Sequence, residues 1–305
     1  MTRPPSRVGY LEAVLAAILW GSSGIFATHL FRVGVPPLSV AVLRPAVGLV
    51  FLAAFAVVWR SAAFKVSARG LLAMLLLGGV ATAVFQVAYQ TSMEAVGVPV
   101  TVALLYLAPA MVVMGAGPLL GEKPPLRRVA LSLLSVAGVW LTVLGARGVD
   151  VQITPRGIGW GVLAGASYAS YTLFGRYSSP RWGSIATVLY STLGATVLLA
   201  LGLPLAGRSI VLPPTPSAWT VLVLFGLLTI ALAAFLFYDA LGRIEAGRAA
   251  IASTMEPVVA ALLATALLGQ GLSGWGWIGL LLVVAGVAGA YGGEAAPEAT
   301  PPAHE

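Results

Sequence analysis

Apolar segments long enough to cross a lipid bilayer follow one another along almost the whole chain. A membrane-spanning helix needs about 20 apolar residues, because it rises only about 1.5 Å per residue through a hydrocarbon core roughly 30 Å thick. Ten such segments can be counted in the 305 residues. They cover about 10–30, 37–59, 70–92, 97–119, 127–146, 157–178, 182–204, 217–241, 246–269 and 274–292. We therefore predict an all-α integral membrane protein with ten transmembrane helices.

The composition excludes a soluble protein and a thiol-based active site. Hydrophobic residues make up 59% of the chain and charged residues 9%, whereas a soluble domain has about 25% charged residues. The 36 glycines suit helices that pack closely in lipid, where water does not drive their association. The absence of cysteine rules out disulfides, thiolate metal sites and cysteine nucleophiles.

The positive charges indicate which side of the membrane each end of the chain occupies. With the N-terminus in the cytoplasm, twelve of the 17 Lys and Arg residues fall in or beside cytoplasmic loops, four fall in outside loops, and Arg44 stays within the membrane. This asymmetry is typical of an N-in/C-in topology. Because topology accounts for the net charge of +7, we do not expect nucleic acid as a partner.

Landmark residues repeat at an offset of 148 positions. Trp20 then falls on Tyr168, and Pro109 falls on Pro257. Each half would contain five spans, an odd number, so the second half would be inserted upside down, as in the inverted repeats of secondary transporters. The predicted units are a first five-helix repeat, an inverted second repeat and a disordered cytoplasmic tail, at 1–148, 149–293 and 294–305.

Aromatic and polar residues from several predicted spans lie at one depth. Counting along the spans places five of them within roughly one turn of the membrane midplane: Trp20, Tyr106, Tyr168, Tyr190 and Ser253. This layer suits a site for a small amphipathic solute, with Ser22 beside it and Gln86 toward the exit path. The alternative is ordinary bundle packing, in which each hydroxyl bonds a neighbouring backbone group, and Gln86 could equally be an interfacial anchor.

Two charged residues, Arg44 and Glu256, stand well inside apolar spans, whereas the other charges in the spans lie within a few residues of an end. A charge there is costly and usually faces a cavity or a partner. Glu256 could carry a proton, bind a substrate ammonium, or be a hydrogen-bonded structural carboxyl. Arg44 could reach a substrate carboxylate, helix-end carbonyls or Glu256, or it could simply tie helices together. Pro109 and Pro257 interrupt both halves at one depth, so we predict that they act as hinges.

Short motifs recur in a fixed order along the chain. They are Trp20-Gly21-Ser22-Ser23, Arg44, Leu120-Gly121-Glu122, Tyr238-x-Ala240-Leu241, Glu256-Pro257 and Leu268-Gly269. Over about residues 8–292 this order resembles the drug/metabolite transporter superfamily, specifically its EamA-type ten-helix exporters and, among them, amino-acid exporters of the YddG kind. One departure is Gln270, where the family often has a glutamate matching Glu122. The resemblance implies a central cavity lined by spans 1–4 and 6–9, with spans 5 and 10 peripheral.

No arrangement of residues typical of an enzyme occurs, so we expect neither catalytic residues nor a cofactor or metal ion. The chain lacks a nucleotide-binding domain, and transport would therefore be facilitated or driven by an ion gradient. We predict a secondary transporter in the inner (cytoplasmic) membrane that exports small amphipathic metabolites, above all amino acids, by alternating access. The alternatives are an exporter of cationic or aromatic drugs driven by proton exchange, and a non-transporting membrane scaffold. The expected partners are a small-molecule substrate and the lipid bilayer, with the chain acting as a monomer.

Overall fold

The computed structural model describes residues 7–59, 61–121, 125–145, 154–268 and 272–292. All the secondary-structure elements assigned within these ranges are helices. The predicted disordered tail at 294–305 and the loop positions Glu122 and Gln270 lie outside the described residues.

The helices of the first half are α1 (Arg7–Gly21), α2 (Ser23–Arg32), α3 (Pro37–Trp59), the 3₁₀ helix η1 (Ser61–Phe64), α4 (Ala68–Ala73), the π-helix η2 (Met74–Gly78), α5 (Gly79–Leu105), α6 (Ala108–Leu120) and α7 (Leu126–Leu144). Those of the second half are α8 (Pro155–Trp182), α9 (Ser184–Leu205), α10 (Pro216–Gly226), the π-helix η3 (Leu227–Leu232), α11 (Ala233–Arg243), α12 (Ala246–Ser253), α13 (Met255–Leu268) and α14 (Gly274–Gly292).

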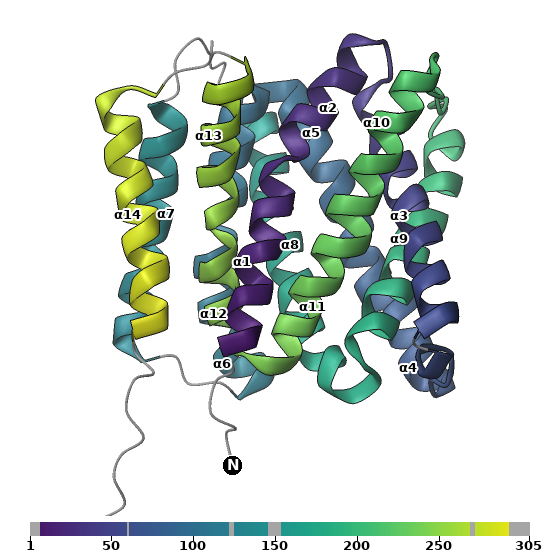
Figure 1. Cartoon of the computed structure of the whole chain (residues 1–305), viewed down its shortest axis with the longest axis horizontal. Helices are drawn as coiled ribbons and strands as arrows, with labels where there is room; N and C mark the ends of the chain where they lie inside the picture. Colours follow the sequence, from purple (N-terminus) through teal and green to yellow (C-terminus); the bar gives the residue numbers. More distant parts are fainter. Residues whose placement is uncertain (1–6, 60, 122–124, 146–153, 269–271, 293–305) are drawn as a thin grey trace, which may run out of the picture.

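The long helices form one bundle and run side by side between its two ends (Figure 1). Six segments have the length and apolar composition needed to cross a membrane: Arg7–Arg32, Pro37–Val58, Ala68–Tyr89, Ser184–Leu205, Pro216–Arg243 and Ala246–Leu267. The prediction of an all-helical protein with several membrane-spanning helices is thus confirmed. The end of the bundle where α1 begins is called the N-terminal end below.

Helix α5 reverses direction part of the way along its length. The hydroxyl of Thr101 donates to the hydroxyl of Ser92 at 2.8 Å. Nine residues of a straight helix would separate these positions by roughly 13 Å, so the chain must fold back between them. This reversal lies where the sequence predicts a boundary between two spans, at about 92–97.

Two prolines follow interruptions in helices that would otherwise continue. Pro109 is the second residue of α6, which begins after a turn at Tyr106–Leu107, and Pro257 is the third residue of α13, which begins after Thr254. Proline fits the first turn because its missing N–H would have no partner there, and it disrupts the turn before it. At the second break, the hydroxyls of Ser253 and Thr254 donate to carbonyls three residues earlier, at 2.7 and 2.6 Å.

Each half also contains a π-helical segment beside a glycine crossing. Gly79 follows η2 and packs against α9, where a Cβ on Gly79 would lie 2.9 Å from the Cα of Gly194. Gly226 precedes η3 and packs against α3, where a Cβ on Gly226 would lie 2.9 Å from the nitrogen of Gly48. Small residues allow such backbone contact between membrane helices, and a π segment shifts the helical register of the residues that follow it.

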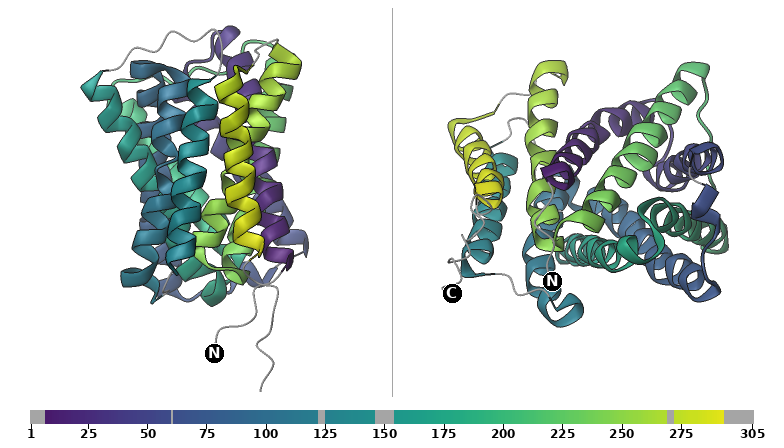
Figure 2. Two further views of the ribbon diagram at one scale, coloured as in Figure 1. Left: turned by 90° about the vertical axis from the view of Figure 1, so that its left-hand side faces the viewer. Right: turned by 60° about the horizontal axis from the view of Figure 1, so that its bottom comes forward.

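Helices α7 and α14 pack against each other at one side of the bundle (Figures 1 and 2). A Cβ on Gly138 of α7 would lie 2.8 Å from the carbonyl oxygen of Gly279 in α14, so this contact also requires glycine. The pair lies at the periphery of the bundle, where the family resemblance places spans 5 and 10, and it packs on α12 and α13 through a small buried cluster that includes Val139 and Val283.

The largest buried apolar cluster fills the N-terminal end of the bundle. It takes residues from α1, α3, α6, α8, α9, α11 and α12. Its members on α1 include Tyr10, Ala13 and Ala16, and those on α3 are Leu52 and Ala56, toward the end of that helix. At the opposite end, separate smaller clusters join α2, α3 and α10, and α3, α5 and α9. One shared core therefore closes the N-terminal end, whereas the other end is held by separate contacts.

Ion pairs reinforce the N-terminal end. Arg243, the last residue of α11, donates to Asp239 of its own helix at 2.6 and 2.8 Å, and its Nε lies 3.2 Å from Glu12 of α1. Asp239 and Arg243 stand four residues apart, a spacing that brings side chains together on one face of a helix. Glu245 also pairs with Arg128 at the start of α7.

Candidate functional site

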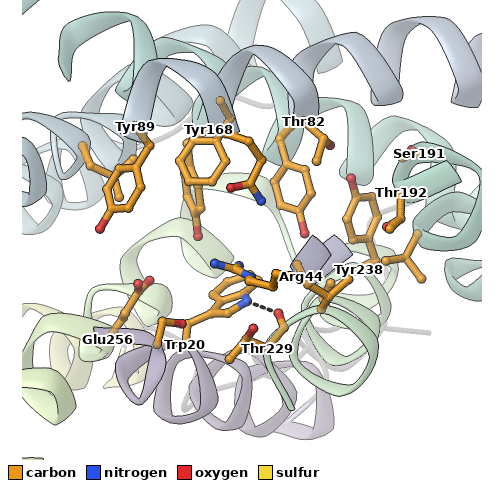
Figure 3. Close-up of a pocket in the computed structure, with 18 residues that line it drawn as sticks. Trp20, Arg44, Thr82, Tyr89, Tyr168, Ser191, Thr192, Thr229, Tyr238 and Glu256 are labelled. Carbon is orange, nitrogen blue, oxygen red and sulfur yellow. Dashed lines mark hydrogen bonds between the residues drawn. The ribbon is translucent and has the colours of Figure 1, made fainter. Parts of the chain in front are cut away.

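A cavity of about 90 Å³ lies beside Trp20, at the edge of the core cluster (Figure 3). Its volume is enough for several water molecules. The residues that line it come from nine elements: Trp20, Ser23, Arg44, Thr82, Phe85, Gln86, Tyr89, Leu105, Tyr168, Tyr171, Val188, Ser191, Thr192, Thr229, Ile230, Ala234, Tyr238 and Glu256.

Arg44 supplies a guanidinium and Glu256 a carboxyl group to this cavity lining. The Arg44 guanidinium carbon lies 4.8 Å from the centre of the Phe225 ring, and its Nε has no hydrogen-bond partner among the described residues. Within the described part of the chain, no ion pair joins Arg44 to Glu256. In Figure 3 the guanidinium points toward the end of the cavity where Glu256 lies. Two opposite charges thus face one cavity without neutralising each other by direct contact.

The local structure explains why a carboxyl group is tolerated at Glu256. This residue lies in the first turn of α13, and the positive end of a helix dipole favours a carboxylate there. The polar end of the Tyr106 side chain also lies near the Glu256 carboxyl group. Both effects follow from the helix break before α13, which brings this helix start to the cavity.

Aromatic rings form much of the cavity wall. Trp20 lies 6.2 Å from Tyr168 and 5.0 Å from Phe237, measured between ring centroids. Tyr171 stacks on Phe237 at 6.0 Å and meets Tyr238 edge-on at 4.8 Å. Such offset and edge-on contacts stabilise a rigid arrangement of rings.

The π-helix η3 fixes the position of Trp20. A π segment interrupts the regular ladder of backbone hydrogen bonds and leaves a carbonyl available. The Trp20 indole N–H donates to the Thr229 carbonyl, which lies within η3, at 2.7 Å (Figure 3). This N–H is therefore used between helices, and Trp20 presents its ring to the cavity.

The structure brings five of the nine predicted site residues to the cavity. These are Trp20, Arg44, Gln86, Tyr168 and Glu256.

The other four predicted residues do not line the cavity. Among them, Tyr106 lies beside Glu256, which does line it. Ser22 lies at the break between α1 and α2, and its hydroxyl donates to the Leu19 carbonyl at 2.6 Å. The neighbouring residue, Ser23, lines the cavity. Tyr190 packs against the core cluster. Ser253 is 1% exposed and donates to a backbone carbonyl.

Sequence reasoning did not select several lining residues on α5, α8 and α9. Thr82, Phe85, Gln86 and Tyr89 follow the spacing i, i+3, i+4, i+7 and therefore share one helix face. That periodicity was the signal that could have identified Thr82 and Phe85. Tyr171 follows Tyr168 at the same kind of spacing. Within the described residues, no cluster of histidine, aspartate and glutamate has the make-up of a metal site.

Comparison with known proteins identifies relatives over nearly the whole chain. The sequence profile of the EamA-like transporter family matches twice, at residues 7–144 and 155–292. The uncharacterized inner membrane transporter YicL of Salmonella typhimurium is 23% identical, with 92% of this chain and 94% of YicL covered. The uncharacterized transporter YwfM of Bacillus subtilis is 28% identical, with 91% of both chains covered.

Two further similarities concern an exporter and a solved structure. The threonine/homoserine exporter RhtA of Salmonella typhimurium is 29% identical, with 90% of this chain and 88% of RhtA covered. A solved crystal structure superposes with a TM-score of 0.77 at 20% identity, covering 92% of this chain and 96% of that chain. At this identity the superposition shows a shared fold alone. The apolar spans and these relatives mark a multi-pass protein of the inner membrane.

Proposed function

Since this chain belongs to the EamA-like transporter family, we propose that it is a secondary transporter that exports amino acids across the inner membrane. The observation that carries the choice of substrate is that Arg44 and Glu256 line one cavity with no ion pair between them among the described residues. The narrower likeness to exporters of the YddG kind stays a prediction.

A zwitterion satisfies both charges at once. A buried charge without a partner is unfavourable, because the protein interior solvates it poorly. The α-carboxylate of an amino acid can accept paired hydrogen bonds from the Arg44 guanidinium, a geometry that arginine favours. The α-ammonium can then donate to Glu256, and the aromatic wall can contact the remaining apolar surface.

Several features support a ten-helix, inverted 5+5 architecture. The family profile matches each half once. The reversal within α5 supplies a boundary between two spans. Each half has a π segment beside a glycine crossing, and a helix break beside Pro109 or Pro257. Matching interruptions in two halves are what alternating access between inverted repeats would use.

The proposed direction of transport comes from one relative, and the predicted topology indicates which end of the bundle must open for export. With the N-terminus in the cytoplasm, the shared core and the ion pairs of the N-terminal end face the cytoplasm. Loading an exported substrate would require this end to open. RhtA is named as an exporter, and we propose the same direction of transport for the present chain.

The main alternative is an exporter of cationic or aromatic drugs driven by proton exchange. The aromatic wall and Glu256 would suit a flat cation. Arg44 opposes this, because its permanent charge in the same cavity repels a cation. A non-transporting scaffold would not need a polar cavity lined by two charges.

Flux measurements in proteoliposomes test the proposal. Radiolabelled amino acids should accumulate by counterflow, and unlabelled amino acids should compete. Analogues that lack the α-carboxylate, or the α-amino group, should compete poorly. Efficient competition by cationic dyes and by decarboxylated amines, with none by amino acids, would favour the drug exporter. Repeating the assay with and without a pH gradient shows whether transport is coupled to protons.

A further inference from the structure

The end of the cavity away from Glu256 is lined by neutral hydroxyl groups. In Figure 3, Thr82, Ser191, Thr192 and Tyr238 lie toward this end, and Arg44 lies between them and Glu256. These four residues, called the hydroxyl end below, come from α5, α9 and α11. Ser191, Thr192 and Tyr238 are 2%, 5% and 0% exposed, so they line an interior space.

Several threonine hydroxyls in the bundle bond to the backbone of their own helix. Each of five threonines donates to the carbonyl four residues earlier, at 2.7–3.0 Å: Thr142, Thr172, Thr196, Thr229 and Thr265. This is the ordinary arrangement for threonine within a helix.

Thr82 departs from this arrangement. Its Oγ1 is buried and has no hydrogen-bond partner among the described residues, although the residue lies within α5 and lines the cavity. Across the cavity, the hydroxyls of Ser191 and Tyr238 are likewise buried without a hydrogen-bond partner among the described residues. A buried hydroxyl that is not bonded to protein is a place where a ligand or water completes the hydrogen bonding.

We propose that the hydroxyl end is the subsite for the side chain of the transported amino acid. This subsite selects a neutral side chain that bears a hydroxyl group, and Thr82 determines the selection. The proposal rests on the transport of amino acids inferred above. If Arg44 and Glu256 hold the two backbone charges of the substrate, its side chain extends toward the hydroxyl end.

The chemistry of the hydroxyl end distinguishes three classes of side chain. A charged side chain would meet no counter-charge among the four residues that define it. An apolar side chain would leave the Thr82 hydroxyl buried and unpaired. A hydroxyl can both donate and accept, so it can pair with Thr82 and with the neighbouring hydroxyls. Sites built for such a bond reject analogues that lack it far more strongly than apolar pockets reject a methyl difference.

Threonine and valine provide a matched pair of substrates, because they have nearly the same shape and differ in one hydroxyl. We would measure counterflow of both amino acids by the full-length protein in proteoliposomes. The wild type should prefer threonine by a factor on the order of 100 in kcat/KM. Thr82→Val should reduce this preference at least tenfold, because threonine flux should fall far more than valine flux. Thr82→Ser, which keeps the hydroxyl, should retain the preference.

Thr196→Val is the matched control, because this threonine bonds its own helix and does not line the cavity. It should leave the preference unchanged. Equal transport of threonine and valine by the wild type would overturn the subsite while leaving amino-acid transport standing. Equal loss of both fluxes in Thr82→Val, with the protein still folded, would show that Thr82 has only a structural role. Absence of flux for every amino acid would overturn the proposed function itself.

Discussion

Replacing Arg44 by glutamine removes the permanent positive charge from the cavity and keeps a polar side chain of similar length. If the guanidinium binds the substrate carboxylate, this change deletes one partner of a buried charge pair. Such deletions cost about 2–5 kcal/mol. We expect the lower value, because Arg44 already rests on Phe225 and the cavity has room for water. At about 1.4 kcal/mol per tenfold change, 2 kcal/mol corresponds to roughly 30-fold weaker binding.

The assay is the concentration dependence of amino-acid counterflow, which should show an apparent affinity about 30-fold lower for Arg44→Gln. A decarboxylated amine should compete better against this variant than against the wild type, because the repulsion by the guanidinium is gone. Arg208→Gln removes an exposed arginine and should match the wild type. An amino-acid affinity within threefold of the wild type in Arg44→Gln would refute the assignment of the carboxylate to Arg44.

Two further changes test the frame that holds the cavity. Trp20→Phe removes the indole N–H that donates to the Thr229 carbonyl. Leaving this buried carbonyl unpaired should destabilise the protein by about 1–3 kcal/mol, so we expect a lower midpoint of thermal unfolding in detergent. An unchanged midpoint would contradict the role given to η3. Gly79→Leu places a side chain where a Cβ already lies 2.9 Å from the Cα of Gly194, so the yield of folded protein should fall sharply. Gly24→Leu serves as its control, because a Cβ there would meet nothing within 4 Å.

The membrane spans and the helix interruptions could be predicted from the sequence because they depend on local chemistry. Apolar length specifies where a span can occur, and proline disrupts the preceding turn wherever it stands, as at Pro109 and Pro257. The depth of a residue in the membrane also follows from counting along its span.

The direction of each side chain around its helix could not be predicted in the same way. Counting along the span places Tyr190 at the same depth as the cavity residues, but Tyr190 packs against the core cluster, because depth does not specify which face of the helix a residue occupies. The cavity is lined by Ser23 and not by Ser22, because the helix is interrupted between α1 and α2. The π segments η2 and η3 depend on contacts between helices, so no local pattern predicts them, and they rotate all the lining residues that follow.

The two carboxylates around Arg243 determine what happens to its charge when the N-terminal end opens. Asp239 belongs to the same helix as Arg243, whereas Glu12 belongs to α1. If α1 and α11 move apart, the contact with Glu12 breaks and the contact with Asp239 travels with α11. The arginine therefore keeps a counter-ion throughout, and separation costs only an ion pair near the membrane surface, a contact worth about 1 kcal/mol or less. This end of the bundle can thus be tightly closed at rest and still open without leaving Arg243 unpaired.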